Sequence, residues 1–319
     1  MSFAIALVFN RQVLLPALVL GCAAAGLYGL LALTLVLTYR VSRTIGFVMG
    51  GIAVLSTYSY YAFTAAIGGA CSVAGTDKAC MGPVPAAALV ILMAAAIGGV
   101  YGLTVTGRRM ASWPPIVRTT YSLAGLLTLA GLTFTILPVE NRRGPSIFGK
   151  GVVRMFGAIV TVHQVATVLI LLALVVLLGF LLQRTRTGVH IRAIADDVEA
   201  SRYLGIPLSR VGTGVYAFSG ALAGLAGVLL TSTVGPDPTN ILFIFLRALI
   251  VAVLGGFTSL SLALAGSFLL AVSETMLTAG VLGHVPVERR EIIVMSGIFA
   301  LVFVINRLRP QRVLEATGL

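Results

Sequence analysis

The sequence predicts an all-α polytopic membrane protein, a single domain over 1–319 that forms a bundle of eight or nine transmembrane helices, some of them broken. Of its residues, 58% are hydrophobic and 10% are charged. Uncharged runs at 12–39, 44–76 and 79–107 are each long enough to cross a bilayer core of ~30 Å. Lipid cannot satisfy backbone polar groups, and these runs are too long for barrel strands, so we expect helices.

Seven uninterrupted spans are expected in order along the chain, at about 14–38, 47–67, 84–106, 116–137, 157–182, 211–234 and 292–305. Basic residues at 40–43 and 108–109 close the first and third spans. Trp113 and two prolines precede the fourth span, which suits an anchor at the membrane interface.

A further apolar stretch at 241–272 follows a sharp Gly-Pro-Asp-Pro turn at 235–238. A glycine pair and several hydroxyl residues interrupt this stretch at 255–261. We therefore expect two short helices that meet at a break. Irregular backbone at membrane depth must be enclosed by protein or line a cavity, so we expect the same of this break.

A charged segment at 188–208 divides the fifth span from the sixth, whereas residues 155–183 and 211–236 on either side carry no charge. Its apolar residues recur at roughly helical spacing and predict one short amphipathic helix: Ile191, Ile194, Val198 and Leu204. Gly205 and Pro207 are expected to end that helix.

Two interpretations of this amphipathic helix remain open. It lies either in a groove of another protein or on the bilayer surface. Three acids within four residues, Asp196, Asp197 and Glu199, favour the groove, because surface helices usually present Lys and Arg to anionic lipid.

The net charge of +12 is carried by short loops between spans, so the positive-inside rule explains it and no nucleic-acid partner is expected. If the charged segment is cytoplasmic, 13 of the 22 Lys and Arg residues lie on its side. The C-terminus then lies inside, and the loop 140–154 is the main exception. Cys71 and Cys80 then lie outside, as a candidate disulfide or as two free thiols.

No catalytic or metal site is expected. Residues 144–151 nearly spell a phosphate-binding loop, but Gly151 occupies the position that needs a hydroxyl for magnesium. His163, His190 and His284 have no partner at metal-ligand spacing. We therefore expect a chain that is not an enzyme and binds no cofactor, so that any ATP is used by a partner subunit.

The charged segment also carries a family resemblance. Thr187-Gly188, Arg192-Ala193, Asp196-Asp197 and Gly205-Ile206 resemble, in this spacing, the cytoplasmic coupling segment of the permease subunit of branched-chain amino-acid type ABC importers. Further matches occur at 26–33, 117–119, 218–228, 247–248 and 253–260. The resemblance covers nearly the whole chain.

The resemblance implies a permease subunit that moves a small solute, an amino acid or a related compound, across the inner membrane. It implies a second homologous permease, two cytoplasmic ATPase subunits that use the ATP, and an extracytoplasmic solute-binding protein. Outer basic residues are candidate docking charges for that binding protein, with lipid headgroup contact as the alternative: Arg142, Arg143, Lys150 and Arg154.

The coupling segment, about 184–210, would then be a cytoplasmic coupling helix. The residues expected to contact the ATPase are Arg192, Asp196, Asp197, Gly205 and Ile206. The buried face of the helix would carry Ile191, Ile194 and Val198.

One departure concerns the solute. After the first span the family usually has an Asn-Phe-Ala-His-Gly-like sequence, whereas this chain has Gly-Phe-Val-Met-Gly at 46–50. The change weakens the assignment of a branched-chain amino acid and leaves the transporter class intact.

Two glycine-rich breaks in otherwise apolar helices, at 46–51 and 255–261, are the expected lining of the translocation pathway, with tight helix packing as the alternative. The residues in question are Gly46, Phe47, Met49, Gly50, Gly51, Gly255, Gly256 and Ser259. The alternative function is a secondary transporter or channel without an ATPase. Such a protein often carries an ionisable residue within the bilayer, and here Glu274 at the end of an apolar run is the nearest acid.

Overall fold

The computed structural model describes residues 11–64, 82–107, 110, 113–136, 147–148, 151–155, 158–257, 259–278, 293 and 296–297. The helices before the charged segment are α2 (Arg11–Ser42), α3 (Val48–Thr64), α4 (Pro83–Val105), α6 (Pro115–Ile136) and α7 (Val162–Arg184). Those that follow are α8 (Arg186–Asp196), α9 (Val198–Tyr203), α10 (Leu208–Thr233), α11 (Pro238–Leu254) and α12 (Leu260–Thr278).

The molecule is a helical bundle, and six of its described helices are long and apolar enough to cross a membrane: α2, α4, α6, α7, α10 and α12. The helix α11 is a shorter apolar helix. The expected total of eight or nine crossings stays a prediction, because the expected last span at 292–305 falls largely outside the described residues. Cys71, Cys80 and the basic residues Arg142, Arg143 and Lys150 also lie outside them.

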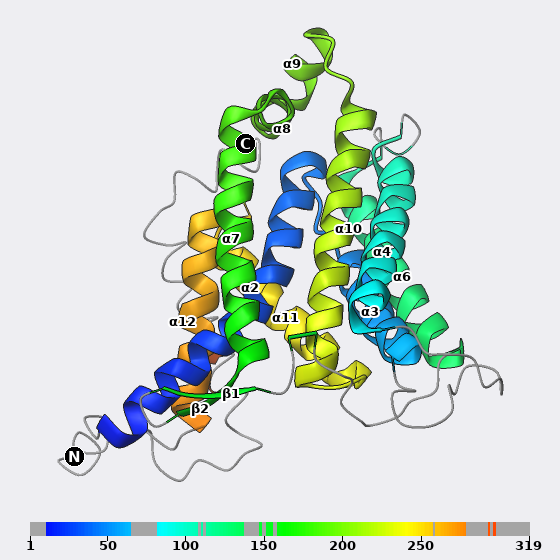
Figure 1. Cartoon of the computed structure of the whole chain (residues 1–319). Coiled ribbons are helices and arrows are strands. Elements are labelled where there is room, and N and C mark those ends of the chain that lie inside the picture. Colours follow the sequence, from blue (N-terminus) through cyan, green and yellow to red (C-terminus); the bar gives the residue numbers. More distant parts are fainter. Residues whose placement is uncertain are drawn as a thin grey trace.

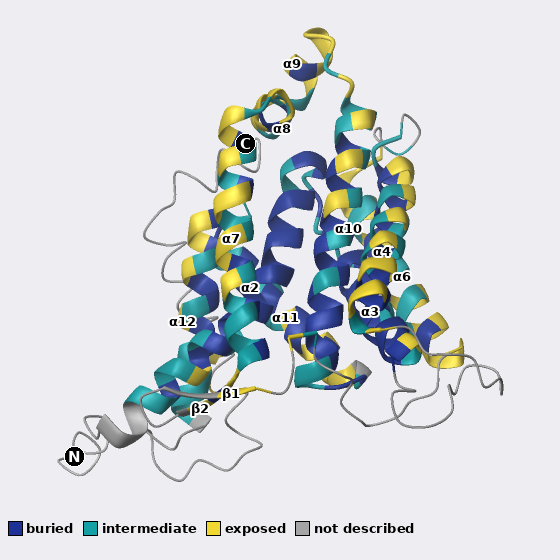
Figure 2. Ribbon diagram, in the orientation of Figure 1, coloured by how far each residue is buried: buried dark blue, intermediate teal, exposed yellow. Residues whose placement is uncertain are grey.

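Helix α2 runs through the centre of the bundle (Figures 1 and 2) and packs against α3, α7, α10, α11 and α12. Its residues from Leu30 to Leu37 are almost completely buried. A central helix that packs against protein on all sides is apolar on all its faces.

Helix α10 packs closely against α4 through glycines. A Cβ on Gly98 would lie 2.5 Å from the carbonyl oxygen of Tyr216, and one on Gly220 would lie 2.5 Å from that of Ala94. Such small residues let two backbones approach in a membrane, where packing rather than exclusion of water holds helices together.

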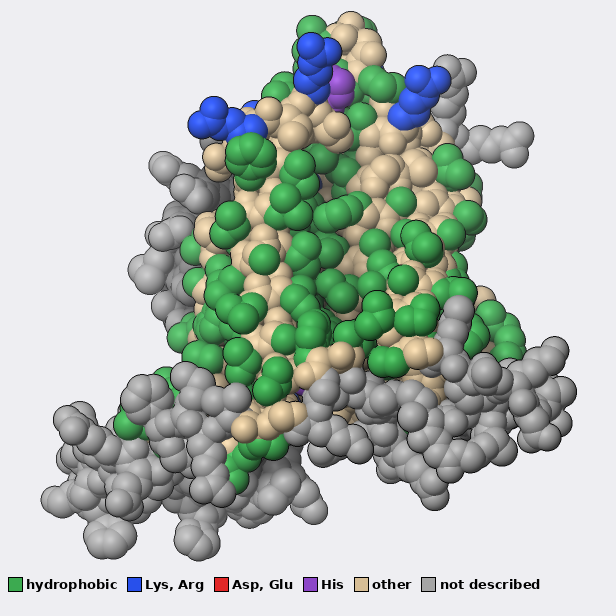
Figure 3. Space-filling view, viewed as in Figure 1, with side chains coloured by type: hydrophobic (Ala, Val, Ile, Leu, Met, Phe, Trp, Pro, Cys, Tyr) green, Lys and Arg blue, Asp and Glu red, His purple; other side chains and the backbone are tan. Residues whose placement is uncertain are grey.

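The outward faces of α6 and α7 are apolar and exposed, for example at Leu127 and Val176. Figure 3 shows that hydrophobic side chains cover the middle of one face, while Lys and Arg gather at the α8–α9 end. This distribution suits a bundle surrounded by lipid with a charged end in water.

The fifth span begins later than the sequence predicts. A two-stranded antiparallel hairpin, β1 (Val152–Met155) and β2 (Ala158–Thr161), precedes α7. The expected helical start at residue 157 is wrong, because Thr161 and Gln164 form a capping box that fixes the start of α7 at Val162. The β-branched residues just before this cap favour the strand.

The break in the apolar stretch at 241–272 is confirmed. Helix α11 ends at Leu254 and α12 begins at Leu260. Asp237 caps the start of α11, since its Oδ1 accepts hydrogen bonds from the backbone N–H groups of Thr239 (3.0 Å) and Asn240 (3.4 Å).

Candidate functional site

The charged segment projects from one end of the bundle between α7 and α10 (Figure 1). It forms two helices, so the single helix expected from the sequence is wrong. Asp197 separates α8 from α9, and its Oδ1 accepts hydrogen bonds from the N–H groups of Glu199 (2.8 Å) and Ala200 (3.0 Å). A carboxylate that caps a second helix competes with continuation of the first.

The apolar face of α8 anchors the segment to the bundle. Ile191 and Ile194 are 7% and 1% exposed and belong to the main hydrophobic core, and Val198 is half-buried against it. Burial of each isoleucine stabilises the segment by roughly 1.5–3 kcal/mol. Arg43, after the end of α2, donates from Nη2 to the carbonyl oxygens of Ala195 and Asp196.

The start of α8 is equally well fixed. The Thr185 hydroxyl accepts from the Gly188 N–H at 3.1 Å and donates to the Leu181 carbonyl at 2.6 Å. Gly188 packs directly on the carbonyl oxygens of Leu181 and Leu182, where no side chain would fit. The turn from α7 into α8 is therefore held by hydrogen bonds and by close backbone contact.

The outward edge of the segment presents charge and two large apolar side chains. Arg192, Asp196, Asp197 and Gly205 are exposed, and Ile206 is half-buried. Tyr203 is 90% exposed, and Leu204, which shares the helical spacing of the apolar residues in the sequence, is 78% exposed. Because α9 starts anew after Asp197, the helical spacing that aligned Leu204 with Ile191 no longer applies.

The segment ends as its residues predict. Gly205 has a φ of +76°, and the N–H of Ile206 bonds to the carbonyl of Ser201 at 3.1 Å. A glycine in this left-handed conformation ends the helix. The two exposed residues just before it, Tyr203 and Leu204, form the tip of the segment. The sequence pattern did not single out Tyr203. Its exposure follows from the position at which α9 ends, which the sequence alone did not give.

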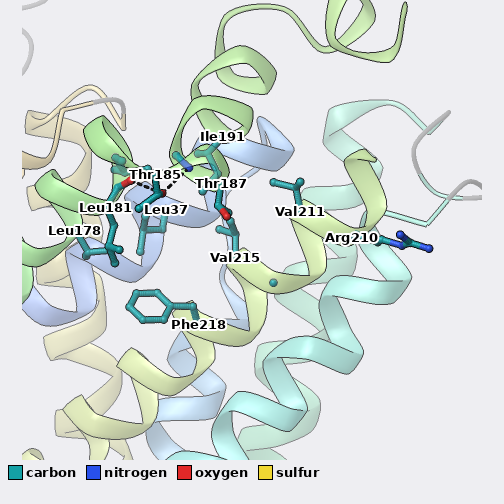
Figure 4. A pocket seen from close by; sticks show the side chains of 13 residues that line it. Leu37, Leu178, Leu181, Thr185, Thr187, Ile191, Arg210, Val211, Val215 and Phe218 are labelled. Carbon is teal, nitrogen blue, oxygen red and sulfur yellow. Dashed lines mark hydrogen bonds between the residues drawn. The ribbon is translucent and has the colours of Figure 1, made fainter. Parts of the chain in front are cut away.

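An apolar cavity of about 390 Å³ lies under α8, between α2, α7 and α10. Figure 4 shows Leu37, Leu178, Val215 and Phe218 around it, while the Arg210 side chain points away. The hydrogen bonds of Thr185 lie at its edge.

The first glycine-rich stretch joins α2 to α3. After Arg43, which has a φ of +55°, the chain turns back along α2, and a Cβ on Gly46 would lie 2.6 Å from Thr38 Oγ1. Phe47 packs edge-on against Phe245 of α11, with ring centroids 6.5 Å apart. The connection therefore runs beside the last turns of α2.

The remaining residues of this stretch lie in the first turn of α3. Met49 is fully buried. A Cβ on Gly50 would lie 2.8 Å from the Phe245 ring, and one on Gly51 would lie 3.0 Å from the Leu126 Cα of α6. These two glycines permit close helix packing.

The second stretch is the break between α11 and α12. Gly256 and Phe257 have φ values of +60° and +55°, and the Phe257 ring stacks on Tyr39 of α2 at 4.7 Å. Gly255 is buried, and Ser259 donates its N–H to the Gly255 carbonyl at 3.2 Å. Left-handed backbone at a phenylalanine is uncommon and marks strain.

The structure thus brings the two stretches to one level of the bundle. Gly46 lies against Thr38, and Phe257 lies against Tyr39, the next residue of α2. The two stretches are about two hundred residues apart in the sequence, so their proximity in the structure could not be predicted from it.

An ion pair between α11 and α12 also escaped sequence reasoning. Arg247 Nη2 lies 3.0 Å from Glu274 Oε1, and the two side chains are 13% and 22% exposed. The Tyr28 hydroxyl of α2 donates to Glu274 Oε2 at 2.9 Å and lies 3.2 Å from Arg247 Nη1. The group ties both halves of the broken stretch to the central helix.

His163, one of the solitary histidines, is buried in the first turn of α7, and its Nε2 lies 3.0 Å from the Leu229 carbonyl of α10. Among the described residues, no group of three or more His, Cys, Asp or Glu side chains is placed to hold a metal ion.

The bundle, with its apolar belt and its projecting charged segment, defines a multi-pass membrane protein. The chain belongs to the family described as branched-chain amino acid transport system / permease component, whose family model matches residues 17–307. Members of this family are transport permease components, not enzymes.

Three curated relatives illustrate the range of the family. The chain is 26% identical to the high-affinity branched-chain amino acid transport system permease protein LivH of Salmonella typhimurium, over 92% of this chain and 93% of the relative. It is 26% identical to BraD of Pseudomonas aeruginosa, a protein with the same description, over 82% and 85%. It is 30% identical to the fructose import permease protein FruF of Bifidobacterium longum, over 60% and 56%. No solved structure matches the chain.

Replacing Arg247 by Met should destabilise the bundle by about 1–3 kcal/mol, because the half-buried Glu274 carboxylate then loses its cationic partner. The double variant Arg247→Met/Glu274→Met should recover much of this loss, since neither charge remains buried. Thermal unfolding of the purified chain in detergent measures both effects as a double-mutant cycle. Arg210→Met, at an exposed arginine, is the matched control. Equal melting of Arg247→Met and Arg210→Met would contradict a stabilising ion pair.

Proposed function

We propose that this chain is the transmembrane permease subunit of an importer of the inner membrane, powered by a separate ATPase that docks on α8 and α9. The observation that carries the proposal is that this segment is buried on one face and exposed on the other. Its inner face is locked into the bundle by Ile191, Ile194 and Arg43, while its outer edge carries Asp196, Asp197 and the exposed tip. Because the segment is fixed to the bundle and its outer edge is exposed, a partner that binds this edge and moves can displace the helices of the bundle.

The tip has the composition of a docking surface. Exposed aromatic side chains surrounded by charge are typical of residues that carry much of the energy of a protein interface. Tyr203 is such an aromatic side chain, Leu204 beside it is an exposed aliphatic one, and three exposed carboxylates belong to the same segment: Asp196, Asp197 and Glu199. With Arg192, Gly205 and Ile206 they make up the proposed ATPase-coupling surface.

We place this surface in the cytoplasm, with the C-terminus, because most of the basic residues lie on its side. The ATP is bound by the partner subunits and not by this chain. A second homologous permease, two ATPases and an extracytoplasmic solute-binding protein complete the proposed assembly. The exposed apolar faces of α6 and α7 offer surfaces for lipid and for the second permease.

The solute is proposed to be a small polar compound, an amino acid or a related molecule. Relatives described as branched-chain amino acid permeases cover most of the chain, whereas FruF, described as a fructose permease, covers less of it. The proposed pathway passes the turn of α2 at Thr38 and Tyr39, which Gly46 of the first stretch and Phe257 of the second contact. Strained, glycine-containing backbone from two elements at one level is the feature that supports it.

The first test of this function is charge removal on the coupling surface. Reversal at Asp197 would also delete the cap of α9, so the variant of choice is Asp196→Lys/Asp197→Asn, because asparagine retains a capping oxygen. In the reconstituted transporter it should lower uptake at least about tenfold by weakening charged contacts with the ATPase. Solute-stimulated ATP hydrolysis and uptake are measured together.

Asp237→Asn is the matched control for this variant, since Asp237 caps α11 with the same geometry outside the segment. It should leave uptake unchanged. Normal uptake in the double variant, with a normal melting temperature, would exclude the proposed coupling surface.

The second test concerns Met49, which stands where the family usually has His. If the α2–α3 connection shapes the pathway, Met49→His should change which solutes are carried. The control Met49→Leu, which conserves volume, should preserve selectivity. Competition by a panel of amino acids and sugars against uptake measures this. A lower melting temperature with unchanged selectivity would show that Met49 only packs the core.

A further inference from the structure

A second cavity lies beneath the charged segment, near the end of α8, whereas the apolar cavity lies near its start. Its volume is about 230 Å³, and the ends of α2, α4, α6, α8, α9 and α10 surround it. Unlike its neighbour, it is lined by polar and charged side chains as well as apolar ones: Ser42, Arg43, Thr106, Arg118, Glu199 and Arg202. A roomy polar cavity at the end of a membrane bundle holds water or a polar ligand.

The charges around this cavity do not balance. Three guanidinium groups, from Arg43, Arg118 and Arg202, face one carboxylate, that of Glu199, which leaves a formal charge of +2. Within the described part of the chain no ion pair joins Glu199 to Arg118 or Arg202. The excess positive charge favours an anion of charge −2.

One donor of this group has no acceptor. The Nε of Arg118 is buried and has no hydrogen-bond partner among the described residues. Buried N–H groups are nearly always paired, so this side chain at the cavity retains a donor for which the described residues supply no acceptor. Arg118 comes from α6, a membrane-spanning helix, which places this donor on the fixed side of the cavity.

The other two arginines come from different elements. Arg43 adopts a left-handed φ of +55° and donates to the carbonyl oxygens of Ala195 and Asp196, so it forms a wall that joins α2 to α8. Arg202 lies on α9 and is exposed. An anion between Arg118 and Arg202 would bridge a spanning helix and the projecting segment.

We propose that this cavity is a binding site for a phosphate group, supplied either as free inorganic phosphate or as the phosphomonoester headgroup of a lipid. Guanidinium groups bind phosphate oxygens through paired N–H donors. The dianion matches the formal charge of the cavity. Bound phosphate would fasten α9 to α6 and so stiffen the coupling surface. The binding itself does not depend on an ATPase, so this inference and the proposed function can fail separately.

The test is equilibrium dialysis of the full chain, purified in detergent, against radiolabelled inorganic phosphate at constant ionic strength set with chloride. We expect saturable binding of one phosphate per chain. Arg118→Gln should weaken it at least about tenfold, as expected for loss of a charged hydrogen bond. Arg186→Gln, at an exposed arginine of α8 outside the cavity, should leave it unchanged.

Arg202→Gln provides a second variant at an exposed position, in case Arg118→Gln does not fold. It too should weaken phosphate binding. Absence of saturable binding, or equal binding by the Arg118 and Arg186 variants, would overturn the proposal.

The source of the phosphate is decided in nanodiscs. Displacement of labelled phosphate by phosphatidic acid, and not by phosphatidylcholine, identifies a lipid headgroup. Retention of labelled phosphate in both identifies the free anion. Release of phosphate on adding the ATPase subunit would show that an acidic side chain of the partner fills the cavity, and would overturn the proposal for the assembled transporter.

Discussion

The packing of the central helix α2 is the constraint on which the rest of the structure depends. Inside lipid an irregular backbone can persist only where protein encloses it. Three irregular or charged features of the described residues are accordingly tied to α2. Tyr28 donates a hydrogen bond to Glu274 of the Arg247–Glu274 pair. Thr38 and Tyr39 contact the two glycine-containing stretches. Arg43, just after the helix, donates hydrogen bonds to α8.

This arrangement connects the proposed ATPase-coupling surface to the proposed pathway over a short distance along the chain. The last turn of α2 touches both proposed pathway stretches, and Arg43, one residue beyond the helix, bonds to the end of α8. A displacement of α8 by a partner would therefore act directly on the turn of α2 that carries both stretches. The apolar cavity near the start of α8 and the polar cavity near its end leave room for such a displacement.

Most of the span positions could be predicted from the sequence, because hydrophobic length and terminating charges are local properties. The break at Gly255 and the glycine stop at Gly205 were likewise local and were found. The split between α8 and α9 was missed, since helical spacing takes no account of the capping strength of Asp197, and the helical alignment of Leu204 with Ile191 fails as a result. The hairpin before α7 was missed because hydrophobicity alone does not separate strand from helix.

The remaining features depend on contacts between distant residues. Nothing local in the sequence indicates that Arg247 and Glu274 meet Tyr28, or that Gly46 and Phe257 reach neighbouring residues of α2. The proposed phosphate site under the charged segment is of the same kind, since Arg43, Arg118 and Arg202 come from three separate parts of the chain.

The central claim is that the exposed tip of α9 meets an ATPase subunit. The most direct measurement is photo-crosslinking from a benzophenone amino acid placed at Tyr203, with the same group at the exposed Tyr121 of α6 as control. We expect the Tyr203 position to give an adduct with the mass of this chain plus the ATPase, and the Tyr121 position to give none. An ATPase adduct from Tyr121, or lipid adducts alone from Tyr203, would contradict the account.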